Sequence, residues 1–157
     1  MRISFDLDEV LFVDPHTYRT EKELRFPLNK VYRERLREGT VRLIHQLQIE
    51  GFEVWVYTSS FRPQAYIQGL FRHYGVHFDQ IVNAERHLKE VQRDRLQPLP
   101  QKLPNHYHIA LHIDDEDVVV QNGRIYGFEV LQIDEPDDEW VEKVLTAARR
   151  IRSRGIS

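Results

Sequence analysis

Acidic residues follow apolar segments at two places in the sequence. Asp6 and Asp8 stand two residues apart after the apolar stretch that begins near the N-terminus. Two carboxylates at this spacing could share a cation, or divide the roles of nucleophile and acid–base catalyst. Positions 114–117 carry four consecutive carboxylates, whose mutual repulsion a hard cation such as Mg²⁺ would relieve. A turn in the first case and a solvated acidic loop in the second are the alternative interpretations.

Hydroxyl groups and a lysine provide chemistry suited to an anion. Thr58 and Ser59 lie just before a helical pattern that starts at Pro63, where free backbone N–H groups could bind phosphate. Plain helix capping is the alternative. Lys102 lies in the proline-rich loop 97–105, from which a flexible ammonium could reach a phosphoryl oxygen. Its alternative is a solvated lysine, and Lys89 competes for the same role.

The elements that must position these residues alternate between strands and helices. Short segments rich in β-branched and aromatic residues predict strands at 2–6, 53–58, 80–83, 108–113 and 128–133. Helical spacing predicts helices at 36–50, 63–74, 84–96 and 137–154, and the pair at 122–123 suggests a tight hairpin. This order predicts an α/β fold, a Rossmann-like three-layer sandwich with a mostly parallel sheet of about five strands. In such sheets ligands bind beyond the carboxyl ends of the strands.

Length and composition exclude several classes of protein. The chain has 157 residues, so residues 1–157 are expected to form a single domain. Because it has no cysteine, a disulfide scaffold, a thiolate zinc site and a cysteine nucleophile are excluded. Its apolar runs are too short to span a membrane, and the N-terminus becomes acidic too early for a secretory signal. We therefore expect a cytoplasmic protein with no membrane partner. The net charge of −3 shows no basic excess that would indicate a nucleic-acid partner.

The order of the motifs resembles that of the haloacid dehalogenase-like (HAD) hydrolase superfamily, largely Mg²⁺-dependent phosphatases. The residues that carry the resemblance are Asp6-Leu7-Asp8 after one strand, Thr58 after the next, Lys102, and Asp114-Asp115 after a later strand. The likeness extends from residue 2 to about residue 135. One departure is Glu9-Val10 where the family usually has Gly-Thr or Gly-Val. We expect a right-handed turn there, which accepts glutamate, and hence a divergent member.

The resemblance implies a two-step phosphoryl transfer. Asp6 would be the nucleophile that forms an aspartyl-phosphate, and Asp8 the general acid and then the general base. Thr58 and the Ser59 backbone N–H would hold phosphoryl oxygens, and Lys102 would neutralise charge. Mg²⁺ would be held by the Asp6 carboxylate, the Asp8 backbone carbonyl and Asp114, with Asp115 assisting directly or through water.

The substrate is left open by the sequence. Only 50 positions separate Asp8 from Thr58, so segment 9–35 is expected to be a small flap and connection, with a minimal or absent cap. A small phosphorylated substrate is the first expectation, and an open site also suits a homo-oligomer. A polynucleotide end phosphatase and a non-catalytic phosphate-binding or interaction module are the alternatives. Basic residues that could favour nucleic acid, against a solvated face as the simpler interpretation, are Arg19, Lys22, Arg25, Lys30, Arg33, Arg35 and Arg37. His106, His108 and His112 share strand parity, which leaves a zinc or second-metal site as a minor alternative.

Overall fold

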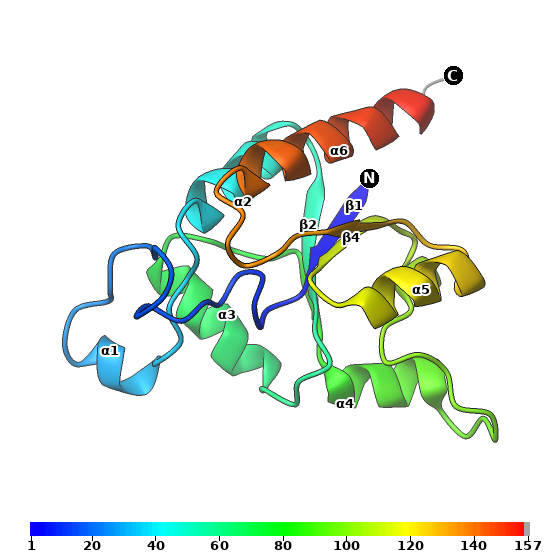
Figure 1. Cartoon of the computed structure of the whole chain (residues 1–157). Helices are drawn as coiled ribbons and strands as arrows, with labels where there is room; N and C mark the ends of the chain where they lie inside the picture. Colours follow the sequence, from blue (N-terminus) through cyan, green and yellow to red (C-terminus); the bar gives the residue numbers. More distant parts are fainter. Residues whose placement is uncertain (156–157) are drawn as a thin grey trace.

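The computed structural model describes residues 1–155 and contains a five-stranded, entirely parallel sheet. The strand order is β3-β2-β1-β4-β5, with β1 in the centre (Figure 1). The strands are β1 (Arg2–Phe5), β2 (Glu53–Tyr57), β3 (Gln80–Val82), β4 (Ile109–Asp114) and β5 (Val130–Gln132). Their carboxyl ends lie at one edge of the sheet because all neighbouring pairs are parallel. The expected α/β fold is therefore confirmed, and each end of each strand lies within two residues of its predicted position.

Helices cover both faces of the sheet. The helical segments are α1 (Leu28–Val31), α2 (Thr40–Ile49), α3 (Gln64–His73), α4 (Ala84–His87), the π-helical turn η1 (Leu88–Gln92), the 3₁₀ turn η2 (Pro104–Tyr107), α5 (Asp117–Tyr126) and α6 (Trp140–Gly155). Apolar side chains of α2, α3 and α6 form one core with alternate strand residues such as Phe5, Val56 and Ile113. The opposite face carries a smaller cluster that includes Tyr57, Val91 and Tyr107. Strand side chains alternate between these two layers, as the pleat requires.

The hairpin predicted at 122–123 is wrong. Asn122 and Gly123 lie inside α5, which ends at Gly127 in the left-handed conformation with φ 81°. Gly123 is buried where a Cβ atom would stand 2.6 Å from the backbone oxygen of Phe128. The glycine therefore allows the helix to pack closely against the chain that leads into β5, rather than forming a turn.

Helix boundaries also differ from the sequence pattern for identifiable reasons. The predicted helix 36–50 begins only at Thr40, because Leu36 and Arg37 form isolated bridges with Phe12 and Thr20. The predicted helix 84–96 is α4 followed by η1, and it ends at Arg93, whose φ is 49°. Within this region Arg86 pairs with Glu90, and Lys89 pairs with Glu85.

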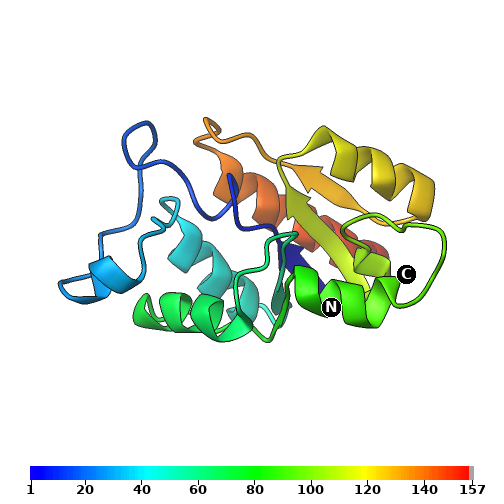
Figure 2. The ribbon, with the colours of Figure 1, turned by 90° about the horizontal axis from the view of Figure 1, so that it is seen from below.

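The segment between β1 and α2 is small. Within residues 9–39 the one helix is α1, which has four residues, and the segment extends to the side of the sheet in both views (Figures 1 and 2). Two of its basic residues serve the fold: Arg37 is buried and donates to the carbonyls of Asp134, Glu135 and Asp137, and Arg35 donates to Thr20. No helix within residues 1–155 combines the length and apolar character needed to cross a membrane.

Candidate functional site

Asp6 leaves the carboxyl end of the central strand and points into the site. Its backbone N–H donates to the carbonyl of Ile113 in β4 at 3.0 Å, which continues the sheet by one residue. Its Oδ1 accepts the backbone N–H of Leu7 at 2.8 Å, and the residue is buried. The strand pairing therefore places the Asp6 carboxylate beside the end of β4.

Lys102 joins the ends of β1 and β4. Its Nζ lies 3.2 Å from Asp6 Oδ1 and 2.6 Å from Asp114 Oδ2, and its side chain is 3% exposed. Burial opposes its charge, but the two carboxylates raise the pKa of Lys102 above its ordinary value, so the ammonium is retained. Lys89, the competing residue, is exposed and pairs with Glu85. The structure thus brings Lys102 and not Lys89 to the ends of these strands.

A buried chain of hydrogen bonds supports Asp114 from behind. The Nε2 of His112 lies 2.8 Å from Asp114 Oδ2, and its Nδ1 lies 2.7 Å from the Oγ of Ser4. Burial lowers the pKa of His112, which favours a neutral ring that donates through Nε2–H. Burial opposes ionisation of Asp114, yet the His112 hydrogen bond and the Lys102 ammonium hold the pKa of Asp114 below its usual range. Ser4 and His112 on neighbouring strands therefore orient this carboxylate.

The three histidines predicted to share one face of a strand do not do so. His106 lies in the η2 turn and His108 follows it with φ 54°, so only His112 belongs to β4. The break in the strand pattern comes from Pro104, which opens the 3₁₀ turn. The predicted alignment of the three histidines on one face of a strand is therefore wrong.

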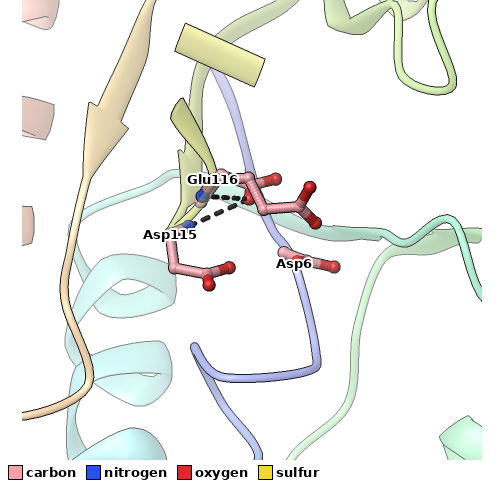
Figure 3. Close-up of side chains that lie close together, drawn as sticks. Asp6, Asp115 and Glu116 are labelled. Carbon is pink, nitrogen blue, oxygen red and sulfur yellow. Dashed lines mark hydrogen bonds between the residues drawn. The ribbon is translucent and has the colours of Figure 1, made fainter. Parts of the chain in front are cut away.

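Four carboxylates gather at the ends of β1 and β4. Asp6, Asp114, Asp115 and Glu116 each offer an oxygen, and these oxygens lie within 4.8 Å of one another. In Figure 3 Asp6 approaches Asp115 and Glu116 from the neighbouring strand end. The backbone N–H groups of Asp115 and Glu116 both donate to Asp114 Oδ1, at 2.9 and 3.1 Å, which fixes the loop.

The electrostatics of this group fit a divalent cation. Burial, together with the charge of Asp114, raises the pKa of Asp6 to about 7. Burial, a hydrogen bond with Glu9 and neighbouring carboxylates raise the pKa of Asp115 to about 8. In the absence of a cation Asp6 and Asp115 would hold protons near neutral pH while Asp114 stays ionised, and a cation would replace those protons. Hard oxygen donors are those that Mg²⁺ prefers, so the donor set suits this ion.

Glu9 occupies the position at which the chain departs from the Gly-Thr pattern. Its φ is 65°, in the left-handed region, so the expectation of a right-handed turn is wrong. The backbone conformation is the one that favours glycine, and the glutamate adopts it at a cost. Its side chain forms the hydrogen bond with Asp115 already described. Glu9 is therefore an acidic residue of this site to which the sequence assigned no role, whereas Glu116 was expected there only as part of the acidic run 114–117.

Thr58 and Ser59 lie in a turn between β2 and α3 that the side chain of Thr58 closes. Thr58 is buried, its backbone N–H donates to the carbonyl of Val82, and its Oγ1 accepts the N–H of Ser60 at 3.1 Å. Because α3 begins only at Gln64, these residues are not in the first turn of that helix. A phosphate bound here would meet this turn rather than a helix N-terminus.

Asp8 lies apart from the acidic group and binds an arginine. Its two carboxylate oxygens accept hydrogen bonds from Arg62 at 2.9 and 2.8 Å. Arg62 is a residue to which sequence reasoning assigned no role, since 54 positions separate it from Asp8. A cavity of about 650 Å³ is found elsewhere, lined by residues from segments 18–21, 37–42 and 135–142, and contains none of the predicted catalytic residues.

Comparisons with known proteins support the fold and little beyond it. No protein-family model and no curated protein matches the chain. A predicted HAD-like family hydrolase from Porphyromonas gingivalis is 15% identical, with a TM-score of 0.50, over 94% of this chain and 97% of that one. A HAD-superfamily hydrolase, subfamily IA, variant 1, from Geobacter sulfurreducens is 14% identical, with a TM-score of 0.52, over 83% and 88%.

A third similar structure is a chain of the Pnkp1/Rnl/Hen1 RNA repair complex. It is 14% identical, with a TM-score of 0.52, and the match covers 84% of this chain but only 42% of that one. Identities this low report shared architecture rather than shared activity. Together with the parallel sheet and the placement of Asp6, Lys102 and Asp114 at its carboxyl edge, these matches show that the chain has the fold of the HAD-like hydrolases, in a strongly diverged form.

Proposed function

We propose that the chain is a single-domain, Mg²⁺-dependent phosphomonoesterase that works through an aspartyl-phosphate on Asp6. The observation that carries the proposal is the buried Lys102 ammonium, which contacts Asp6 and Asp114, two members of the group of four carboxylates. A carboxylate can approach a phosphate dianion only where fixed positive charge offsets the repulsion. Lys102 supplies one such charge, and the carboxylate group is suited to hold the second.

Asp6, Asp114 and Asp115 would hold the metal, with the Asp8 backbone carbonyl as a further ligand. Glu116 is added to these expected ligands because its carboxylate belongs to the same group. When bound, Mg²⁺ supplies charge neutralisation at the phosphoryl oxygens. The His112 and Ser4 hydrogen bonds would hold Asp114 in one orientation, as supporting residues commonly do for metal ligands.

In the proposed reaction an Asp6 oxygen attacks phosphorus while the bond to the leaving-group oxygen breaks. The leaving oxygen takes a proton from Asp8. Water then attacks the aspartyl-phosphate, gives its proton to Asp8, and releases phosphate and the Asp6 carboxylate. Lys102 stabilises negative charge through both steps, and Thr58 with the Ser59 N–H would hold the remaining phosphoryl oxygens.

Hydrolysis of p-nitrophenyl phosphate with and without Mg²⁺ tests this proposal. We expect turnover that EDTA removes and Mg²⁺ restores, and that Asp6→Asn reduces to background because no nucleophile remains. Asp94→Asn is the matched control, since Asp94 is exposed in the turn after η1 and does not belong to the carboxylate group. Turnover that persists in Asp6→Asn would reject the aspartyl-phosphate, and no turnover in the wild type would favour the non-catalytic alternative.

A polynucleotide end is the second candidate substrate. It is favoured by the similar chain from an RNA repair complex, although Arg35 and Arg37 of the basic segment are engaged within the fold. A panel of nucleotides, sugar phosphates and 3′-phosphorylated oligonucleotides separates the candidates. A kcat/KM that rises with oligonucleotide length would support the polynucleotide substrate, and a preference for small monoesters would exclude it.

A further inference from the structure

Arg62 binds Asp8, the predicted acid–base residue, through two hydrogen bonds that involve both carboxylate oxygens. It lies in the loop between β2 and α3, and its Nη1 and Nη2 donate to the two oxygens of Asp8 at 2.9 and 2.8 Å. This fork-to-fork pairing fixes both the position and the plane of a carboxylate, which a single hydrogen bond does not. The Asp8 side chain is otherwise 55% exposed and has little packing to orient it.

Arg62 is itself held from three other directions. Its Nε donates to Glu34 Oε1 at 3.0 Å, and Glu34 in turn accepts the hydroxyl of Tyr66 in α3. The guanidinium lies over the ring of Phe12, 5.2 Å from its centroid. The backbone carbonyl of Arg62 accepts the side-chain amide of Asn83 at 3.0 Å. An arginine with its fork, its Nε and its backbone all engaged can act as a rigid support for Asp8.

We propose that Arg62 is a positioning residue that orients the Asp8 carboxylate as the base in hydrolysis of the aspartyl-phosphate. The inference rests on the proposed function. In this step the water oxygen forms a bond to phosphorus, the bond between phosphorus and the Asp6 oxygen breaks, and its electron pair returns to Asp6. The water proton goes to Asp8. Each carboxylate oxygen has two lone pairs, so the pairing with Arg62 leaves one on each oxygen free to accept it.

The two half-reactions respond differently to Arg62. A good leaving group such as nitrophenolate departs without a proton from Asp8, so the first half-reaction does not need an oriented Asp8. The second half-reaction always needs the base. Loss of Arg62 should therefore slow release of phosphate from the enzyme and leave the formation of the aspartyl-phosphate nearly unchanged.

Stopped-flow measurement with p-nitrophenyl phosphate and Mg²⁺ tests this separation. For Arg62→Gln we expect a burst of nitrophenolate with the rate of the wild-type first step, followed by a steady-state rate lowered about 10- to 100-fold. Acid-quenched samples analysed by mass spectrometry should show accumulated phosphoenzyme. Arg62→Lys should not restore the rate, because an ammonium cannot reproduce the two-point contact.

Matched variants separate positioning from general effects of losing an arginine. Arg149→Gln removes a two-point pair between α6 and Glu50 at the end of α2, which includes none of the predicted site residues, and should leave turnover unchanged. Glu34→Gln should shift the kinetics in the direction of Arg62→Gln, but less. The double variant Asp8→Asn/Arg62→Gln should be no slower than Asp8→Asn, because Arg62 acts through Asp8.

Three outcomes would overturn the inference. The first is evidence that Arg62 contacts the substrate directly, which would be either an equal loss of burst and steady-state rates or a raised KM without accumulated phosphoenzyme. Unchanged kinetics in Arg62→Gln would reduce the pair to a surface contact. An additive double variant would show that Arg62 does not act through Asp8. A wild type with no turnover dependent on Asp6 rejects the proposed function itself, whereas wild-type turnover with any of these three outcomes rejects only the role of Arg62.

Discussion

At the residue scale, Glu9 combines an unfavourable backbone conformation with a contact to the acidic group. A non-glycine residue at φ 65° costs about 1 kcal/mol relative to glycine. We expect Glu9→Gly to raise the free energy of unfolding by about that amount in urea denaturation. The same change removes the hydrogen bond and the charge that raise the pKa of Asp115, so that pKa should fall below about 8.

Gly51 provides the matched control for Glu9. It has φ 91°, and a Cβ atom added there would have no neighbour within 4 Å, so Gly51→Ala changes the conformational cost without a steric clash. We expect Gly51→Ala to lower the free energy of unfolding by about 1 kcal/mol, opposite in sign to Glu9→Gly. A loss of stability in Glu9→Gly would mean that the Asp115 contact outweighs the backbone cost.

At the scale of elements, Gly123 shows how tertiary packing overrides a local turn signal. A Cβ at this position would stand 2.6 Å from the Phe128 carbonyl oxygen and 3.2 Å from Val130 Cγ2. Alanine favours helix by about 1 kcal/mol over glycine, but the backbone of residue 128 must move to admit it. We expect Gly123→Ala to destabilise the protein by about 1–3 kcal/mol, measured by urea unfolding.

Gln121, exposed in the same helix, is the control for that substitution. Gln121→Ala changes the helix propensity without meeting the chain before β5, so its effect should stay within about 0.5 kcal/mol. If Gly123→Ala is as stable as the wild type or more stable, then helix propensity dominates. The close contact between α5 and residue 128 would then be of little energetic importance.

At the scale of the whole molecule, Glu50 connects α2 to the C-terminal helix. It accepts hydrogen bonds from Arg149 at 2.9 and 2.8 Å, and Arg152 also donates to it. The Arg149 hydrogen bond is the main cause that lowers the pKa of Glu50 from 4.5 to about 2. Because the folded pKa is the lower one, this stabilisation is present above pH 4.5 and is lost as the pH falls toward 2.

Glu50→Gln should therefore be less stable than the wild type at pH 7 by about 1 kcal/mol or less, since solvent screens these partly exposed charges. The difference should shrink between pH 5 and pH 2, as followed by thermal unfolding across this range. A difference that does not change with pH would show that side-chain packing rather than charge accounts for the effect of the substitution.

The parallel sheet and the set of polar residues at its carboxyl edge follow from the amino-acid sequence alone. Strand and helix periods are local properties, and parallel strands bring their ends to one edge whatever the loops do. For that reason Asp6 and Asp114 could be expected together, whereas Lys102, in the loop before β4, was expected beside them only from the resemblance to the HAD-like hydrolases, and the catalytic roles of all three remain predictions. The predicted alignment of three histidines on one strand was wrong because Pro104 begins a 3₁₀ turn, which the strand period does not predict.

The meeting of distant groups is visible only in three dimensions. Arg62 reaches Asp8 across 54 positions, and Ser4 reaches His112 across 108. The packing of α5 gave Gly123 its role, and the path of the chain after β1 placed Glu9 in the left-handed region. Such contacts depend on how strands, turns and helices pack against one another, and neither residue type nor spacing along the chain contains that information.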